Sequence, residues 1–121
     1  MGAASLDIAD DYPNFAISAC EMVLEDPARH RAILVCGSGH GMDMVANKYP
    51  GLRAALCFNT SVAKQSKEHE NANILVFASD WVKEHEAEEI TKIWLETEYG
   101  QAERNERRLK KIQELEAKNF K

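Results

Sequence analysis

The residues best suited to chemistry stand in one short segment, residues 36–42, which reads Cys-Gly-Ser-Gly-His-Gly-Met. Its glycines let backbone N–H groups approach a ligand closely, and a helix that begins directly after them adds a partial positive charge. That field favours a thiolate on Cys36, a hydroxyl follows at Ser38, and the N–H groups suit an oxyanion. The segment predicts a thiol base or nucleophile beside an anion-binding loop. A tight turn with an inert, buried cysteine explains the same residues.

Other chemistries find less support in the chain. Lys48 lies too far along for a Walker loop, and the Gly37-Ser38-Gly39 order lacks the GxSxG spacing of serine hydrolases. Neither His69 nor His85 completes an HExxH motif, so no metal is expected. The chain has three cysteines, Cys20, Cys36 and Cys57, and their spacing matches no zinc-ribbon pattern. An odd number without such a pattern fits a reducing, cytoplasmic setting.

The elements that would position this loop alternate between strands and helices. Short apolar runs predict strands at residues 32–36, 52–57 and 73–78, and the first is expected to be buried on both faces. Helical spacing predicts helices at residues 13–26, 42–48 and 61–70, in a segment ending near Gly100, and at residues 102–121. This alternation predicts a three-layer α/β/α fold with a mainly parallel, Rossmann-like sheet. Ligands are expected at the carboxyl ends of the strands.

Length and composition limit the partners of the protein. A chain of 121 residues with 45% hydrophobic content predicts one domain, residues 1–121. The net charge of -5 argues against binding nucleic acid. No run of about 18 apolar residues is present, and residues 1–5 lack the features of a signal peptide, so no membrane is expected. The charged helix at residues 102–121 has only a thin apolar seam, which suits either a partner subunit or a frayed helix on its own domain.

Several further segments stand around the glycine loop in a fixed order. They are Asp-Tyr-Pro at residues 11–13, Ala-Asn-Lys at 46–48, Pro-Gly-Leu-Arg-Ala-Ala-Leu-Cys at 50–57, Lys-Glu-His at 67–69 and Asn-Ala-Asn-Ile-Leu at 71–75. Together with the loop, this order resembles the ribose-5-phosphate isomerase B family, which includes the galactose-6-phosphate isomerase subunits. The similarity covers nearly the whole chain and is far more specific than a glycine loop alone.

The resemblance implies an aldose–ketose isomerase of a phosphorylated sugar that needs no cofactor and forms a homodimer or higher oligomer. It implies that Cys36 moves a proton between C1 and C2 of the open-chain sugar through an enediolate, with Ser38 as its hydroxyl partner. The enediolate oxygen would be stabilised by backbone N–H groups of the loop, those of Gly37, Gly39, His40 and Gly41.

The family's remaining site residues match positions outside the loop. The resemblance implies that His69 assists ring opening, that Tyr12 lines the pocket, and that Arg104 and Arg108 hold the phosphate. Four residues separate the two arginines, so both lie on one helical face. Without the resemblance, a histidine on a polar helix is more often a surface residue, and Arg104 and Arg108 could simply pair with Glu103 or Glu106. The side chains of His40, Cys57 and His85 are expected to be structural or exposed.

The chain departs from the family pattern at its start and in its pocket. Relatives open with a strand and an Asp-His-x-Gly loop, which this sequence lacks, so the fold is expected to be truncated at its first strand. Glu70 and Asp80 add negative charge where the family commonly has asparagine and arginine, and His40 replaces an aliphatic residue. A second hypothesis is therefore a catalytically impaired sugar-phosphate-binding or partner subunit.

Overall fold

The computed structural model describes residues 11–120, in which helices and strands alternate as the sequence predicts. The elements are α1 (Tyr12–Glu25), β1 (Ala32–Cys36), α2 (His40–Ala46), β2 (Ala54–Leu56), α3 (Thr60–Glu70), β3 (Ile74–Ala78), α4 (Glu84–Glu96) and α5 (Glu103–Asn119). The predicted domain, residues 1–121, extends beyond the described part of the chain at both ends. Residues 1–5, predicted to lack the features of a signal peptide, lie outside it. The predicted last helix also ends beyond it.

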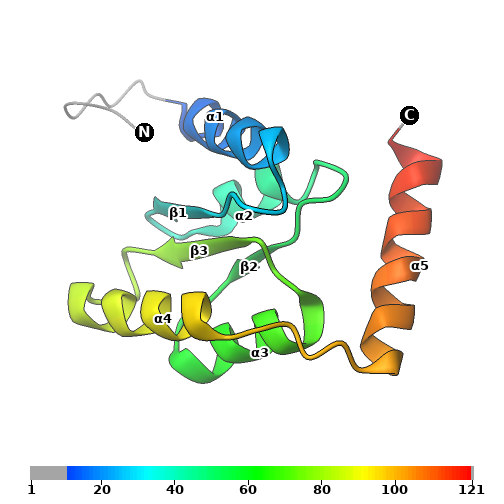
Figure 1. Cartoon of the computed structure of the whole chain (residues 1–121). Helices are drawn as coiled ribbons and strands as arrows, with labels where there is room; N and C mark the ends of the chain where they lie inside the picture. The colour runs from blue at the N-terminus through cyan, green and yellow to red at the C-terminus, as the bar shows by residue number, and fades with distance from the viewer. Residues whose placement is uncertain (1–10, 121) are drawn as a thin grey trace.

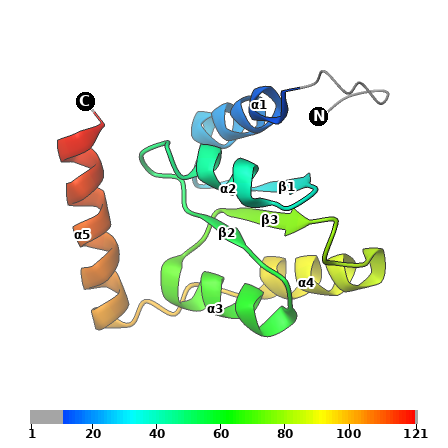
Figure 2. The same cartoon turned by 180° about the vertical axis from the view of Figure 1, so that it is seen from behind.

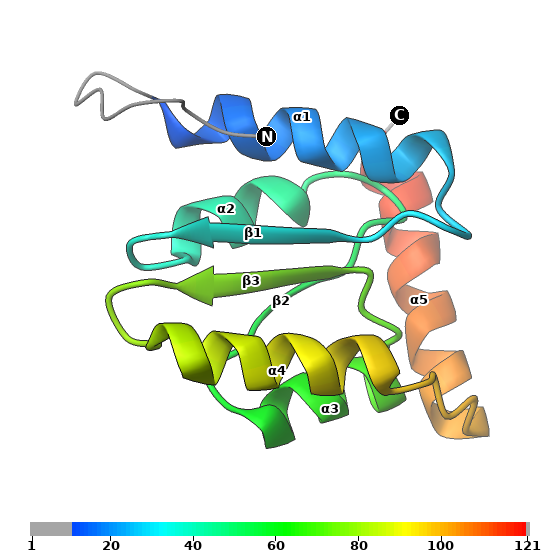
Figure 3. The same ribbon diagram turned by 60° about the vertical axis from the view of Figure 1, so that its left-hand side comes forward.

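The three described strands form one parallel sheet in the order β1-β3-β2. Helices α1 and α2 cover one face and α3 and α4 cover the other, so the molecule has three layers (Figure 1, Figure 3). This confirms the predicted α/β/α class with a parallel sheet. No strand precedes α1 within residues 11–120.

Two apolar clusters form the core, one on each face of the sheet. The central strand β3 is buried at all five positions because it has neighbours on both sides and helices on both faces. Beneath it, the indole of Trp94 from α4 is fully buried. The ammonium of Lys67 from α3 lies 4.4 Å from the centre of that ring, a cation–π contact that joins the two helices.

Strand β1 corrects one expectation, because it is not buried on both faces. Leu34 is buried, whereas Ile33 and Val35 are 42% and 54% exposed. In the described residues β1 pairs only with β3, so one edge of the strand and one of its faces stay open. The apolar composition correctly predicts a strand, but burial depends on neighbouring strands that composition does not specify.

The outer edge of β2 is closed by a side chain. Asn47, directly after α2, accepts a hydrogen bond from the backbone N–H of Ala54 at 2.9 Å and donates one to the carbonyl of Ala54 at 3.1 Å. The amide therefore forms the same two bonds that a neighbouring strand would form. The start of β2 thus has its backbone groups satisfied without a further strand.

Helix α5 stands away from the other helices, near the amino ends of the strands (Figure 2, Figure 3). Its Leu109 is buried, whereas Ile112 and Leu115 on the same seam are largely exposed. A hydrogen bond from the N–H of Gly51 to the carboxylate of Glu116, 2.9 Å long, ties the helix to the loop before β2. Among the described residues, no helix has the length and apolar character needed to cross a membrane.

Candidate active site

Cys36 ends β1 at the carboxyl edge of the sheet, and its side chain is only partly buried. The loop after it is tied to the segment after β3. The carbonyl of Cys36 accepts a hydrogen bond from the N–H of Ser79 at 2.9 Å, and the carbonyl of Gly37 accepts one from Asp80, also at 2.9 Å. Two strand ends therefore hold the loop in place, at the edge where parallel sheets bind ligands.

The glycine loop needs glycine at its tightest point. Gly39 adopts φ 78°, a left-handed conformation, and a Cβ there would meet the side chain of Leu56 and lie 3.2 Å from the carbonyl oxygen of Phe77. Gly39 is the N-cap of α2, and its carbonyl accepts the N–H of Asp43. The backbone thus passes directly over the ends of the neighbouring strands.

Ser38 uses its hydroxyl oxygen within the loop. This oxygen accepts a hydrogen bond of 3.3 Å from the backbone N–H of His40, the first residue of α2. One of the N–H groups expected to serve an oxyanion therefore has a partner in this conformation. The hydroxyl proton of Ser38 can still be donated to a ligand.

Tyr12 and the glycine loop come together although 28 residues lie between Tyr12 and Gly41. A Cβ on Gly41 would overlap the phenol ring of Tyr12, so that ring lies directly against the loop. Tyr12 is 47% exposed, and the exposed aromatic side chains Phe58 and Trp81 follow the ends of β2 and β3. The carboxyl edge thus carries a thiol, a hydroxyl, a phenol and two exposed aromatic rings.

Two carboxylates affect the charge of this edge. Asp80 lies against Gly37, since a Cβ there would be 3.2 Å from its Oδ2. Asp43 on α2 has a buried Oδ1 that has no hydrogen-bond partner among the described residues. Burial raises the pKa of Asp43, while the nearby His40 acts in the opposite direction. The sequence reasoning missed Asp43, although its position three residues after His40 places it near the same helical face.

Cys57 also follows a strand, β2, but it is fully buried. Its Sγ donates to the carbonyl of Ala55 at 3.6 Å, and burial raises the pKa of its thiol to about 11. The thiol is therefore protonated near neutral pH. This agrees with the expectation that Cys57 is structural.

His69, Arg104 and Arg108 lie at the other end of the sheet from Cys36. Helix α3 runs from the end of β2 back to the start of β3, so its last turn, which contains His69, lies at the amino edge. The first turns of α5, with both arginines exposed, follow the hydrogen bond from Gly100 to the carbonyl of Glu68 at the same edge (Figure 3). One chain therefore brings together only part of the expected residue set.

Comparison with known proteins places this geometry in a family. Residues 1–112 match the family model described as Ribose/Galactose Isomerase. The chain belongs to this isomerase family. A Bacillus subtilis protein named as a candidate sugar phosphate isomerase is 41% identical over 110 residues, which are 91% of this chain and 72% of that protein. The ribose-5-phosphate isomerase B of Mycobacterium tuberculosis H37Rv is 35% identical over 115 residues, 95% of this chain and 70% of the relative.

Solved structures of family members share the fold. The crystal structure of Mycoplasma genitalium ribose-5-phosphate isomerase B with bound ribulose-5-phosphate matches with a TM-score of 0.91 and 34% identity, over 97% of this chain and 76% of that chain. The type B enzyme of Trypanosoma cruzi matches with a TM-score of 0.92 and 37% identity, over 98% and 78%. The three-layer fold is therefore that of the isomerase family.

Proposed function

We propose that this chain is an aldose–ketose isomerase of a phosphorylated sugar, of the ribose 5-phosphate/ribulose 5-phosphate type, with Cys36 as its base. The observation that supports this most is the partly exposed Cys36 at the carboxyl end of β1, followed at once by the glycine loop, against which the ring of Tyr12 lies at Gly41. Membership of the isomerase family and the names of the relatives support the reaction class.

The proposed reaction moves one proton between neighbouring carbons. The thiolate of Cys36 takes the proton from C2 of the open-chain aldose. The electrons of that bond form the C1–C2 double bond, and the carbonyl electrons move to O1, giving an enediolate. The O2 proton then passes to O1, and the Cys36 thiol returns its proton to C1 while O2 becomes the carbonyl. The thiolate is regenerated, so no other reactant is consumed.

Loop groups would stabilise the charge that develops on O1. Backbone N–H groups between Gly37 and Gly41 and the hydroxyl proton of Ser38 are the available donors at this edge. The N–H of His40 donates to the hydroxyl oxygen of Ser38 in this structure, so it can donate to a substrate oxygen only if that bond is broken. The loop therefore suits an oxyanion better than a fully charged phosphate.

The negative charge of Asp80 indicates that the phosphate of the substrate binds away from Gly37. Its carboxylate lies beside Gly37, and a phosphate dianion placed there would be repelled by roughly a kcal/mol or more per close charge pair. Arg104 and Arg108 are exposed cations suited to a phosphate, but they lie at the opposite end of the sheet. We propose that a second copy of the chain supplies these arginines and His69 to the Cys36 loop, so that each site in a homodimer is built from two chains.

The hypothesis of an impaired binding subunit is less favoured, because the relatives are named as isomerases and this chain has the thiol of Cys36, a hydroxyl at Ser38 and the glycines of the loop. The test is the interconversion of ribose 5-phosphate and ribulose 5-phosphate by the purified chain. Turnover that is lost in Cys36→Ala and retained in Cys57→Ala supports the proposal. No turnover of this substrate, of allose 6-phosphate or of galactose 6-phosphate, by a folded oligomer, would contradict it and favour the binding subunit.

A mixing experiment tests the shared site. Cys36→Ala and His69→Asn are purified separately, unfolded together and refolded as a mixture. In a randomly mixed dimer, one site of each heterodimer regains both intact residues, so about a quarter of the wild-type activity should return. If the mixture stays as inactive as its two components while size measurements show dimers, Cys36 and His69 do not act across a subunit boundary.

A further inference from the structure

A cavity of about 530 Å³ lies between the body of the domain and the first turns of α5. Arg53 and Asn71, which stand before β2 and β3, line it together with Tyr99 from the segment between α4 and α5. Helix α5 adds exposed, charged side chains, those of Glu103, Glu106, Arg107 and Lys110. Arg104 and Arg108 are not among the lining residues, so the cavity is separate from the cations proposed to bind the substrate phosphate.

Arg53 is a half-buried cation with unused hydrogen-bonding capacity. Its Nε donates to the carbonyl of Asn71 at 2.9 Å, and its Nη1 donates to the carbonyl of Gly51 at 3.3 Å. Within residues 11–120 no carboxylate forms an ion pair with this guanidinium. The two Nη groups of an arginine form a planar fork that matches the two oxygens of a carboxylate. Arg53 therefore offers the cavity an anchor for an anionic group.

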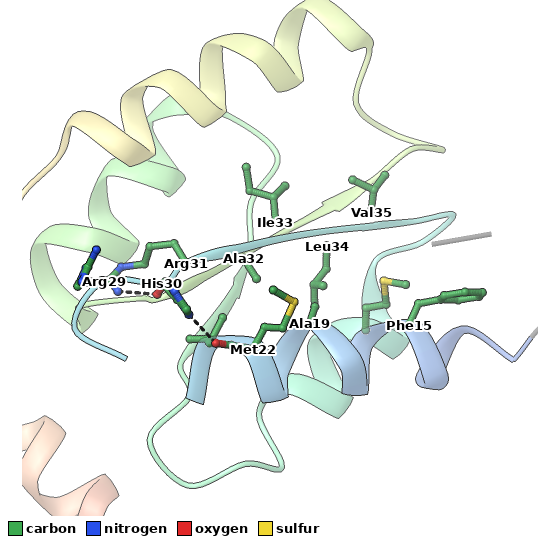
Figure 4. A pocket seen from close by; sticks show the side chains of 12 residues that line it. Phe15, Ala19, Met22, Arg29, His30, Arg31, Ala32, Ile33, Leu34 and Val35 are labelled. Atoms are coloured by element: carbon green, nitrogen blue, oxygen red, sulfur yellow. Dashed lines mark hydrogen bonds between the residues drawn. The ribbon is translucent and has the colours of Figure 1, made fainter. Parts of the chain in front are cut away.

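The charges around Arg53 leave it without a dedicated counterion. Burial lowers the pKa of Arg53, while Glu116 raises it and Arg31 lowers it. The carboxylate of Glu116 already accepts the N–H of Gly51 at 2.9 Å. Arg31, directly before β1, donates to the carbonyl of His30 at 2.7 Å and adds a second positive charge (Figure 4). An anion bound beside Arg53 would reduce the repulsion between the two guanidinium groups.

The hydroxyl of Tyr99 is a second donor at the cavity. It is buried and has no hydrogen-bond partner among the described residues, which is a costly state for a polar group. Burial raises the pKa of Tyr99, and the carboxylates of Glu106 and Glu70 raise it further, so the phenol keeps its proton near neutral pH. Arg53 acts in the opposite direction on this pKa, so the guanidinium lies near the same hydroxyl. The two groups together suit a carboxylate.

Helix α5 brings charges of both signs to the cavity. Glu103 and Arg107 stand four residues apart, as do Glu106 and Lys110, which is the spacing of ion pairs on a helix. Neither pair forms a salt bridge in the described part of the chain. The two carboxylates would repel the second charge of a phosphate dianion, but they can accept hydrogen bonds from an ammonium group. A ligand with one carboxylate and one ammonium therefore matches this lining better than a dianion.

We propose that this cavity binds a small zwitterion of the amino acid class, with one carboxylate and one ammonium group. The carboxylate would accept hydrogen bonds from the guanidinium of Arg53 and the hydroxyl of Tyr99, and the ammonium would donate to Glu103 and Glu106. Since Arg53 belongs to the body of the domain and the glutamates belong to α5, the ligand joins the two. This site is separate from the proposed isomerase chemistry at Cys36.

The test titrates the whole chain with unbranched amino acids, from glycine through β-alanine to γ-aminobutyrate, which vary the separation of the two charges. Saturable binding by at least one of them is expected, with a shift of the Nε–H resonance of Arg53 in NMR spectra. The carboxylic acid and the amine of the same length should each bind at least about tenfold more weakly. Equal binding by either, tighter binding of inorganic phosphate, or no saturation up to about 50 mM would overturn the proposal.

Matched variants locate the site. Tyr99→Phe removes only the hydroxyl and should weaken binding at least about fivefold, whereas Tyr49→Phe, outside the cavity, should bind like the unchanged chain. Glu103→Gln combined with Glu106→Gln should abolish the preference for the amino acid over the carboxylic acid. Glu114→Gln, on the same helix but outside the cavity, should retain that preference. Circular dichroism confirms folding of each variant. Equal losses in test and control variants, or none in either test variant, would overturn the proposal.

Discussion

Cys36 and Cys57 occupy similar places in the chain, at the carboxyl ends of β1 and β2, yet their surroundings differ. Cys36 is partly exposed at the edge of the sheet and is followed by the glycine loop, whose backbone packs closely against neighbouring residues. Cys57 is fully buried, and its thiol contacts a carbonyl two residues before it. Topology alone therefore does not make a thiol useful, because access and the residues that follow decide which one can reach a substrate.

The largest difference is expected in catalysis. Cys36→Ala removes the proposed base and should lower kcat for ribose 5-phosphate by about 10²–10⁴-fold, the range typical of a general base. Cys57→Ala should keep most of the activity, since its thiol does not reach solvent. Steady-state kinetics on both variants measure this. Equal losses in the two variants would remove the distinction between the cysteines.

Alkylation compares the two thiols without any substrate. Iodoacetamide should label Cys36 in the folded protein, whereas Cys20 and Cys57, both fully buried, should react at least about a hundredfold more slowly because labelling requires opening of the structure. Peptide mapping by mass spectrometry follows each site over time. Labelling of Cys57 at the rate of Cys36 would mean that the two environments are alike in solution.

The pH dependence of stability should contain a contribution from Cys57. Burial raises its pKa from 9.0 to about 11, so the unfolded chain ionises this thiol first as the pH rises. The stabilising effect is complete below pH 9 and is lost between pH 9 and about 11, by up to about 3 kcal/mol. Urea unfolding across this range should show a smaller decline for Cys57→Ala. Burial also raises the pKa of Tyr49, but the loss of stability that this causes is the same in both proteins and does not affect the comparison.

The smallest effect concerns Asp43, whose charge also raises the pKa of Cys57. Burial raises the pKa of Asp43 above 3.8, so its contribution to stability is complete below that pH and is lost as the pH rises through the folded value. Asp43→Asn should therefore stabilise the protein at pH 7 by up to about 1 kcal/mol. The gain should disappear near pH 3 in urea unfolding. A loss of stability at pH 7 would mean that the carboxylate has a partner.

The sequence predicted most elements because spacing and strand length are local properties. The predicted strands at residues 32–36 and 73–78 match β1 and β3 closely, and the glycine loop begins α2 as expected. The exposure of Ile33 and Val35 does not follow from their apolar composition alone, because it depends on which strands stand beside β1. A list of apolar residues says nothing about neighbours in the sheet.

The candidate site was predictable only in part. The approach of Tyr12 to Gly41 depends on how α1 packs on α2, which the resemblance implied and spacing did not. The separation of His69 from Cys36 could have been deduced, since a helix that returns from one parallel strand to the next must end at the amino edge. Which chain supplies the arginines is a question of assembly, and it stays a proposal.

The buried indole of Trp94, which contacts Lys67, can be distinguished by fluorescence from the exposed indole of Trp81. Trp94 is sealed between α3 and α4, whereas Trp81 is 76% exposed beside the candidate site. Iodide in solution can therefore quench the emission of Trp81 and leave the blue-shifted emission of Trp94. The emission of Trp81 therefore reports changes at the candidate site, and that of Trp94 reports loss of packing between the sheet and the helices α3 and α4.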